Sequence, residues 1–156
     1  MGGDYPGKRW VTCPVSKGMP LGVSDAVQAT VKKTAAGSFA VDACSGTPML
    51  VRQELLLTDT QRQAERFSTE AAEKTTLFLG MAFGAVPSTI KTAFGTASVI
   101  EFQYAATGTY GTQVIAQTGP LIVSLTVVSD SRLIAADYAE LVEAAMKRVI
   151  LAQLGA

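Results

Sequence analysis

The chain has 156 residues, of which 48% are hydrophobic and 17% are charged, and its 13 basic residues balance 13 acidic ones. This length and composition are typical of one folded domain with a substantial core. Balanced charge does not supply the basic surface that phosphate recognition needs, so we expect no nucleic-acid partner.

Histidine is absent from the chain. Its absence excludes Ser-His-Asp and Cys-His nucleophilic sites, histidine general bases and most zinc sites. The glycine-rich motifs that cradle nucleotide phosphates, G-x-x-x-x-G-K-[ST] and G-x-G-x-x-G, are also missing. We therefore expect no metal site and no cofactor.

The beginning of the chain is rich in glycine, proline and lysine. It predicts an extended N-terminal arm over residues 1–24, with one short strand near residues 9–15, followed by a single α+β domain over residues 25–156. The first ten residues, MGGDYPGKRW, contain no apolar signal region. Either the natural chain begins there in the cytoplasm, or an export segment has been removed and Met1 to Gly3 are not native. The glycine pair after Met1 favours the second alternative.

The most apolar stretch, TLFLGMAFGAVPSTI, is interrupted by Gly80, Gly84 and Pro87. It falls short of the roughly 18 uninterrupted apolar residues of a transmembrane helix, so we expect no transmembrane segment.

Residues 24–37 are ambiguous between a strand and a short helix. Alternation of Val27, Ala29 and Val31 with polar residues indicates a strand, whereas Ser24 could cap a helix. The strand is favoured, and Gly37 with Ser38 then predicts a turn. Two further strands are predicted by apolar runs over residues 38–44 and 48–57.

A helix is predicted over about residues 58–80. Thr58 followed by Gln61 is typical of a capping box, and the glycines after the helix end it. One face of this helix is apolar; it comprises Ala64, Phe67, Ala71, Thr75, Phe78 and Ala82.

The second half of the chain predicts four strands and a helix. The strands lie near residues 88–94, 97–106, 110–118 and 120–129. In VIEFQY, alternation places Glu101 opposite Phe102, on a wet face of the sheet. LIVSLTVV is apolar on one face and semi-apolar on the other, which indicates a central strand covered on both sides. The helix covers about residues 132–154.

The predicted fold is therefore α+β. Hairpin-length turns indicate an antiparallel sheet of about six strands, and the two amphipathic helices over about 58–80 and 132–154 cover it.

Two stretches carry a resemblance to known proteins. They are RQELLLTDTQRQAERFSTEAA, residues 52–72, and residues 95–149, in which an alternating strand, a turn, a second strand, the strand GPLIVSL and an acidic-start helix follow one another. This order resembles small exported bacterial lipoproteins and sensor-like ectodomains, and is similar in layout to the PsbP-like fold of photosystem extrinsic subunits. The resemblance covers about half the chain and implies binding of partners or apolar ligands without a catalytic signature.

The two cysteines, Cys13 and Cys44, allow two interpretations. In an exported chain they predict a disulfide that closes a loop of about thirty residues and pins the arm to the sheet. In a cytosolic chain they are buried apolar thiols. The disulfide is the favoured alternative.

Candidate binding residues are Trp10, Phe102, Tyr104 and Tyr110, which could line an apolar pocket between the sheet and a helix or simply fill the core. Met81 and Phe83, in LFLGMAFGAVPS, are expected either in an exposed apolar loop that docks a partner or in a helix end tucked into the core.

We expect a non-enzymatic, lipoprotein-like, extracytoplasmic domain, periplasmic, in the cell wall or secreted, that binds a protein partner or an apolar small molecule. A lipid anchor upstream of the chain is left open, and a cytoplasmic location is the alternative. One alternative function is a small enzyme that pairs Asp42 or Glu101 with a tyrosine. The other is a structural subunit of a larger assembly.

Overall fold

The computed structural model describes residues 9–15, 21–104 and 107–155, and gives only the backbone for Tyr104 and for residues 149–155. The elements in chain order are β1 (Trp10–Cys13), α1 (Asp25–Gln28), β2 (Val31–Val41), β3 (Met49–Thr58), α2 (Gln61–Phe83), β4 (Val86–Thr92), β5 (Gly95–Tyr104), β6 (Thr109–Thr118), β7 (Leu121–Ser129) and α3 (Ala135–Gly155).

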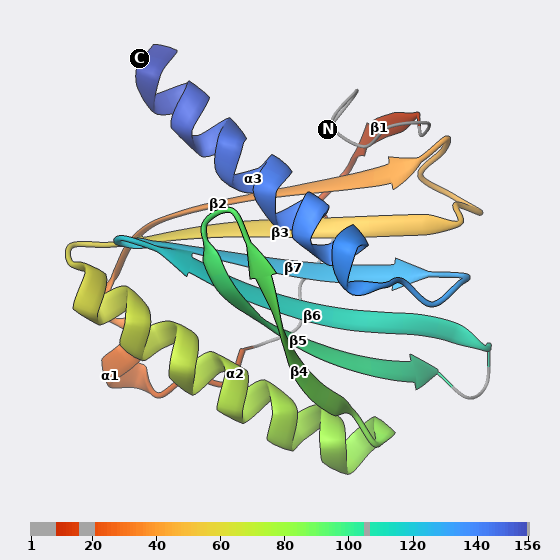
Figure 1. Cartoon of the computed structure of the whole chain (residues 1–156), viewed down its shortest axis with the longest axis horizontal. Coiled ribbons are helices and arrows are strands. Elements are labelled where there is room, and N and C mark those ends of the chain that lie inside the picture. The colour runs from red at the N-terminus through yellow and green to blue at the C-terminus, as the bar shows by residue number, and fades with distance from the viewer. Residues whose placement is uncertain (1–8, 16–20, 105–106, 156) are drawn as a thin grey trace.

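In the described part of the chain, seven strands form one antiparallel sheet in the order β1-β2-β3-β7-β6-β5-β4 (Figure 1). The α+β fold class is confirmed, with one strand more than expected. The additional strand of the sheet is the short strand predicted near residues 9–15 of the arm, which is confirmed as β1 and pairs with β2 at the edge of the sheet.

Helices α2 and α3 cover opposite faces of the sheet. Neighbouring residues of a strand point to opposite faces, and Ile100 packs with the α2 cluster whereas Val99 packs with the α3 cluster. The central strand β7 divides in the same way, since Ile122 joins the α2 cluster and Val123 the α3 cluster. This confirms the prediction that β7 is a central strand covered on both sides.

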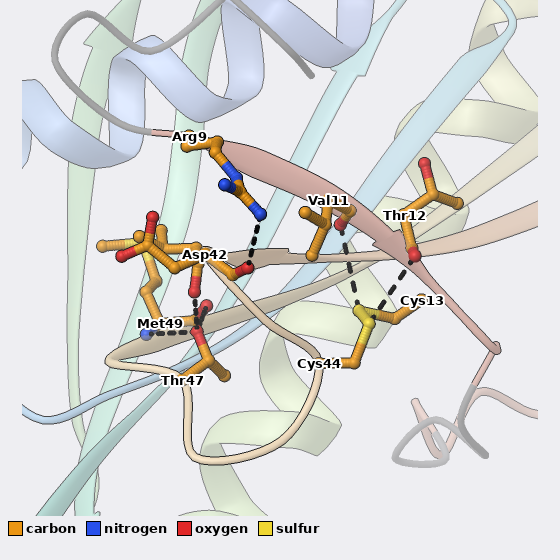
Figure 2. The surroundings of a disulfide bond; sticks show 9 residues. Arg9, Val11, Thr12, Cys13, Asp42, Cys44, Thr47 and Met49 are labelled. Atoms are coloured by element: carbon orange, nitrogen blue, oxygen red, sulfur yellow. Dashed lines mark hydrogen bonds between the residues drawn. A yellow bond between two sulfur atoms is a disulfide. The ribbon is translucent and has the colours of Figure 1, made fainter.

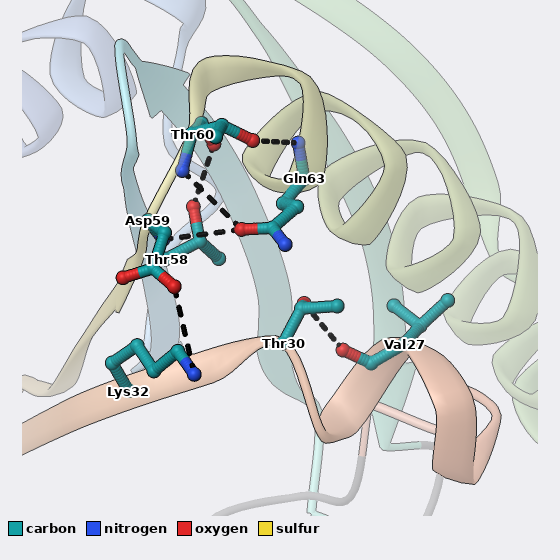
Figure 3. Close-up of polar contacts among 7 residues, drawn as sticks. All are labelled: Val27, Thr30, Lys32, Thr58, Asp59, Thr60 and Gln63. Atoms are coloured by element: carbon teal, nitrogen blue, oxygen red, sulfur yellow. Dashed lines mark hydrogen bonds and ion pairs between the residues drawn. The ribbon is translucent and has the colours of Figure 1, made fainter.

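The N-cap of helix α2 lies two residues later than predicted. Thr60 is the N-cap: its hydroxyl accepts the Gln63 N–H at 3.2 Å, and the Gln63 side chain accepts the Thr60 N–H at 3.3 Å (Figure 3). The predicted cap Thr58 is instead the last residue of β3, because its N–H donates to the Pro120 carbonyl at 3.0 Å. A capping box is thus present, but the prediction placed it on the wrong residues.

For residues 24–37 the sequence left a strand and a short helix open, and the structure contains both. Ser24 caps the single-turn helix α1, and β2 begins three residues after this helix ends. The turn predicted at Gly37 and Ser38 is wrong: these residues pair with Gln53 and Arg52 inside one long strand. Pairing with β3 outweighs the local turn propensity of the Gly-Ser pair.

The disulfide between Cys13 and Cys44 is confirmed, with 5.7 Å between the two Cα atoms (Figure 2). It joins the end of β1 to the loop that follows β2. The same edge is fixed at the other end of β1, where the Asp42 N–H donates to the Arg9 carbonyl at 2.7 Å. Both contacts hold a four-residue strand that has few backbone hydrogen bonds of its own.

Replacing both cysteines by serine should lower the free energy of unfolding by about 3–4 kcal/mol, because the crosslink restricts a loop of 31 residues in the unfolded chain. Denaturant unfolding of the variant and of the oxidised wild type measures this loss. Reduced wild-type protein is the matched control and should lose a similar amount. Equal stability of all three samples would contradict the stapling role.

Candidate functional site

Helix α2 extends beyond the part of it that packs on the sheet. Its buried residues recur every three or four positions and are Ala64, Phe67, Ala71, Thr75 and Leu79. The sequence prediction placed Phe78 on this face, but its side chain is 58% exposed. Leu79, four residues after Thr75, takes the buried position on the sheet side of the helix instead. No residue after Leu79 in this helix is buried.

The end of α2 lies later than predicted. The helix continues through Gly80, which faces open space, and ends at Phe83. Gly84 follows in the left-handed conformation, with φ of 66°, and its N–H donates to the Gly80 carbonyl. The Ala85 N–H donates to the Leu79 carbonyl, which completes a glycine-based helix stop. Met81 and Phe83 are therefore helical rather than in a loop.

Five large apolar side chains lie exposed where α2 ends and β4 begins. We call them the apolar rim; their exposed fractions are 61% for Leu77, 58% for Phe78, 83% for Met81, 42% for Phe83 and 64% for Val86. In Figure 1 these two segments meet at the lower edge of the view.

The rim is anchored to the sheet through Phe83. Its ring stacks on Phe102, with 5.4 Å between the ring centroids. Phe102 in turn lies directly over Gly111, where an added Cβ atom would come within 2.4 Å of the ring. A side chain on residue 111 would displace Phe102, so the glycine allows the close approach.

A groove of about 660 Å³ lies beside the rim, between α2 and the hairpin of β4 and β5. We call it the α2–β4 groove; it is lined by Ala72, Glu73, Thr76, Leu77, Pro87, Ser88, Thr89, Ser98 and Ile100. Glu73 is the charged residue of this lining, and the others are apolar or carry hydroxyl groups. Such a groove is suited to an apolar ligand with few polar groups.

The aromatic residues proposed from the sequence do not gather in one pocket. Trp10 belongs to the α3 cluster and Phe102 to the α2 cluster, on the opposite face of the sheet. Tyr110 is half-buried and pairs with Ser129, and the Tyr104 side chain lies outside the described residues. Phe102 contacts the rim, while a role of all four in ligand binding stays a prediction.

Sequence reasoning included Leu77, Val86 and Pro87 in the candidate segment LFLGMAFGAVPS but did not single them out. A signal for them exists, since residues 75–90 contain no charged side chain.

Glu101 does not lie on an open wet face, because the beginning of α3 covers it. Its side chain is 26% exposed and its Oε2 atom lies 3.6 Å from Nε of Arg132. The Tyr138 hydroxyl donates to the same oxygen at 3.4 Å and lies 2.7 Å from the Thr112 hydroxyl. Asp42, the other proposed carboxylate, is exposed after β2 with a φ of 68°.

Burial raises the pKa of Tyr138 to about 12, and the negative charge of Glu101 acts in the same direction. The phenol therefore remains protonated at neutral pH, where it can donate a hydrogen bond but not act as a general base.

Within residues 9–15, 21–104 and 107–155, no three acidic or cysteine side chains gather where they could hold a metal ion. Across the same described residues, no helix combines the length and apolar character required to cross a membrane.

The ultraviolet absorbance of tyrosinate should show one tyrosine with a pKa of about 12, and Tyr138→Phe should remove this step. Because the folded state holds this proton more tightly than the unfolded state, its contribution to stability is complete below about pH 10 and is lost as the pH rises toward 12. All tyrosines titrating near pH 10 in the folded protein would contradict the buried environment.

No family model matches the chain, and no curated protein matches it. Among solved structures, the chain is similar to the extracellular domain of PknH from Mycobacterium tuberculosis, with a TM-score of 0.50 and 13% sequence identity. The match covers 74% of this chain and 65% of the PknH chain. At this identity the similarity concerns the fold, which resembles that of an extracellular domain.

Proposed function

We propose that the chain is a non-enzymatic, extracytoplasmic binding domain that takes an apolar ligand, or an apolar segment of a protein partner, on the α2–β4 groove and the apolar rim. The observation that carries this proposal is the group of five exposed apolar side chains within residues 77–86, of which Leu77 also lines the groove. A single exposed apolar residue needs no explanation, whereas a contiguous group is typical of interaction sites.

The chemistry of the surface supports an apolar ligand. The rim residues lie within the uncharged run of residues 75–90, so the rim itself contains no charge that a ligand would have to desolvate. The groove volume of about 660 Å³ falls in the usual range of small-molecule sites. Glu73 lies at the groove and could orient a polar end of the ligand.

The disulfide supports the extracytoplasmic location, because such bonds persist mainly in oxidising compartments. The fold similarity to an extracellular domain agrees with it. A lipoprotein-like attachment through an upstream lipid anchor and a PsbP-like relationship belong to the proposal on the basis of the sequence resemblance alone.

Serine at positions 77 and 81 should weaken binding of the uncharged dye Nile red by at least about tenfold, because burial of each Leu or Met side chain contributes about 1.5–3 kcal/mol. A fluorescence titration of the double variant Leu77→Ser, Met81→Ser measures the change. Both side chains are exposed, so the free energy of unfolding should change by no more than about 0.5 kcal/mol per substitution.

The matched control is Val15→Ser, because Val15 is 54% exposed but follows β1, at the edge of the sheet opposite β4. This variant should bind the dye as the wild type does. Equal losses in both variants would indicate non-specific adsorption and contradict the assignment to the groove.

A further inference from the structure

A second cavity, of about 320 Å³, lies on the other side of the hairpin of β4 and β5. We call it the Glu101 pocket. Its apolar walls include Ile90, Val99 and Leu133, and Tyr138 and Arg132 also contribute to it. Strand alternation separates it from the α2–β4 groove, since Val99 and Glu101 point to one face of β5 while Ser98 and Ile100 point to the other.

The carboxylate in this pocket is incompletely paired. The Glu101 side chain is only 26% exposed, yet its contacts are 3.4 Å to the Tyr138 hydroxyl and 3.6 Å to Nε of Arg132. Charge-assisted hydrogen bonds are normally about 2.7–2.9 Å long. A carboxylate with largely apolar surroundings and only long contacts can accept a further cationic donor.

Arg132 interacts only weakly with the Glu101 carboxylate. Its side chain is 72% exposed, and the contact with Glu101 runs through Nε rather than through both branches of the guanidinium group. Exposed ion pairs of this kind contribute little free energy. A competing cation could therefore displace Arg132 from the carboxylate at small cost.

The charges around the pocket favour a cation over an anion. The beginning of α3 would otherwise attract an anion through its free N–H groups. Asp137 already lies there, and its Oδ2 atom accepts the Ile134 N–H at 2.9 Å. The beginning of α3 is thus already occupied by a carboxylate, and within the pocket Glu101 is the more buried of the two charged side chains.

We propose that the Glu101 pocket binds a small organic ammonium ion with a short apolar chain. The ammonium group lies against the Glu101 carboxylate, in the place that Arg132 now approaches, and the apolar chain packs on Ile90, Val99 and Leu133. The hydrogen bond from Tyr138 fixes the carboxylate, and Thr112 fixes the Tyr138 hydroxyl in turn. This site is independent of the apolar ligand proposed for the groove.

The test is a titration of the isotopically labelled full chain with n-butylammonium, followed by amide chemical shifts. The expected shifts map to residues 99–101 and 132–138 and saturate. The neutral analogue n-pentanol and the anion pentanoate, at the same concentrations, should bind at least about tenfold more weakly because they lack the charge-assisted contact.

Two substitutions separate the roles of the charged residues. Glu101→Gln keeps the shape of the side chain and should weaken n-butylammonium binding at least about tenfold. Arg132→Gln, the matched control, removes the competing cation and should keep or increase affinity. The proposal is overturned if n-butylammonium causes no shifts in the pocket, if Glu101→Gln binds it as well as the wild type, or if pentanoate binds more tightly.

Discussion

The arrangement of the whole molecule depends on where the contact between α2 and the sheet stops. The small side chains of Ala64 and Ala71 let the helix approach the sheet, and Phe67 fills the space between them. This buried row ends at Leu79, but the helix ends only at Phe83. The last turn of the helix therefore extends beyond the residues that pack on the sheet. On that turn Met81 is exposed, and Phe83 reaches the sheet only through its contact with Phe102. The mismatch between the length of the helix and the length of its buried row therefore exposes part of the apolar rim, and Leu77, Phe78 and Val86 extend it on either side.

The two edges of the sheet differ, and this difference also favours binding of a partner at the apolar rim. At one edge, β1 is fixed by the disulfide, and its Trp10 is buried in the α3 cluster. At the other edge, β5 is the only described strand that pairs with β4, and the first four residues of β4 are exposed. Pro87 lacks a backbone donor and Lys91 adds a charge, and both features discourage pairing with a further strand. A partner at this open edge would therefore contact side chains and grooves rather than pair with the backbone of β4. The hairpin of β4 and β5 separates an apolar groove on one face from a carboxylate pocket on the other.

Most of the fold could be predicted from the sequence because its signals are local. Alternation identified the strands from β4 to β7, and helical spacing identified α2 and α3. The errors arose where contacts with residues distant in the sequence determine the local structure. Gly37 lies in a long strand because it pairs with Gln53, and Thr58 ends a strand because it bonds to Pro120. The candidate sites were less predictable. Spacing alone could not choose between Phe78 and Leu79 as the buried residue, and Glu101 meets Tyr138, a residue 37 positions away.

The central claim is that the end of α2 and the beginning of β4 present apolar side chains to solvent. Methyl NMR of the full chain in the presence of a soluble gadolinium chelate tests it most directly. The methyl signals of Leu77, Met81 and Val86 should relax strongly, while those of the buried Leu79 and Ile100 should be nearly unaffected. Protection of Leu77 and Met81 to the same degree as Leu79 would show that the helix end is folded into the core, and would contradict this account.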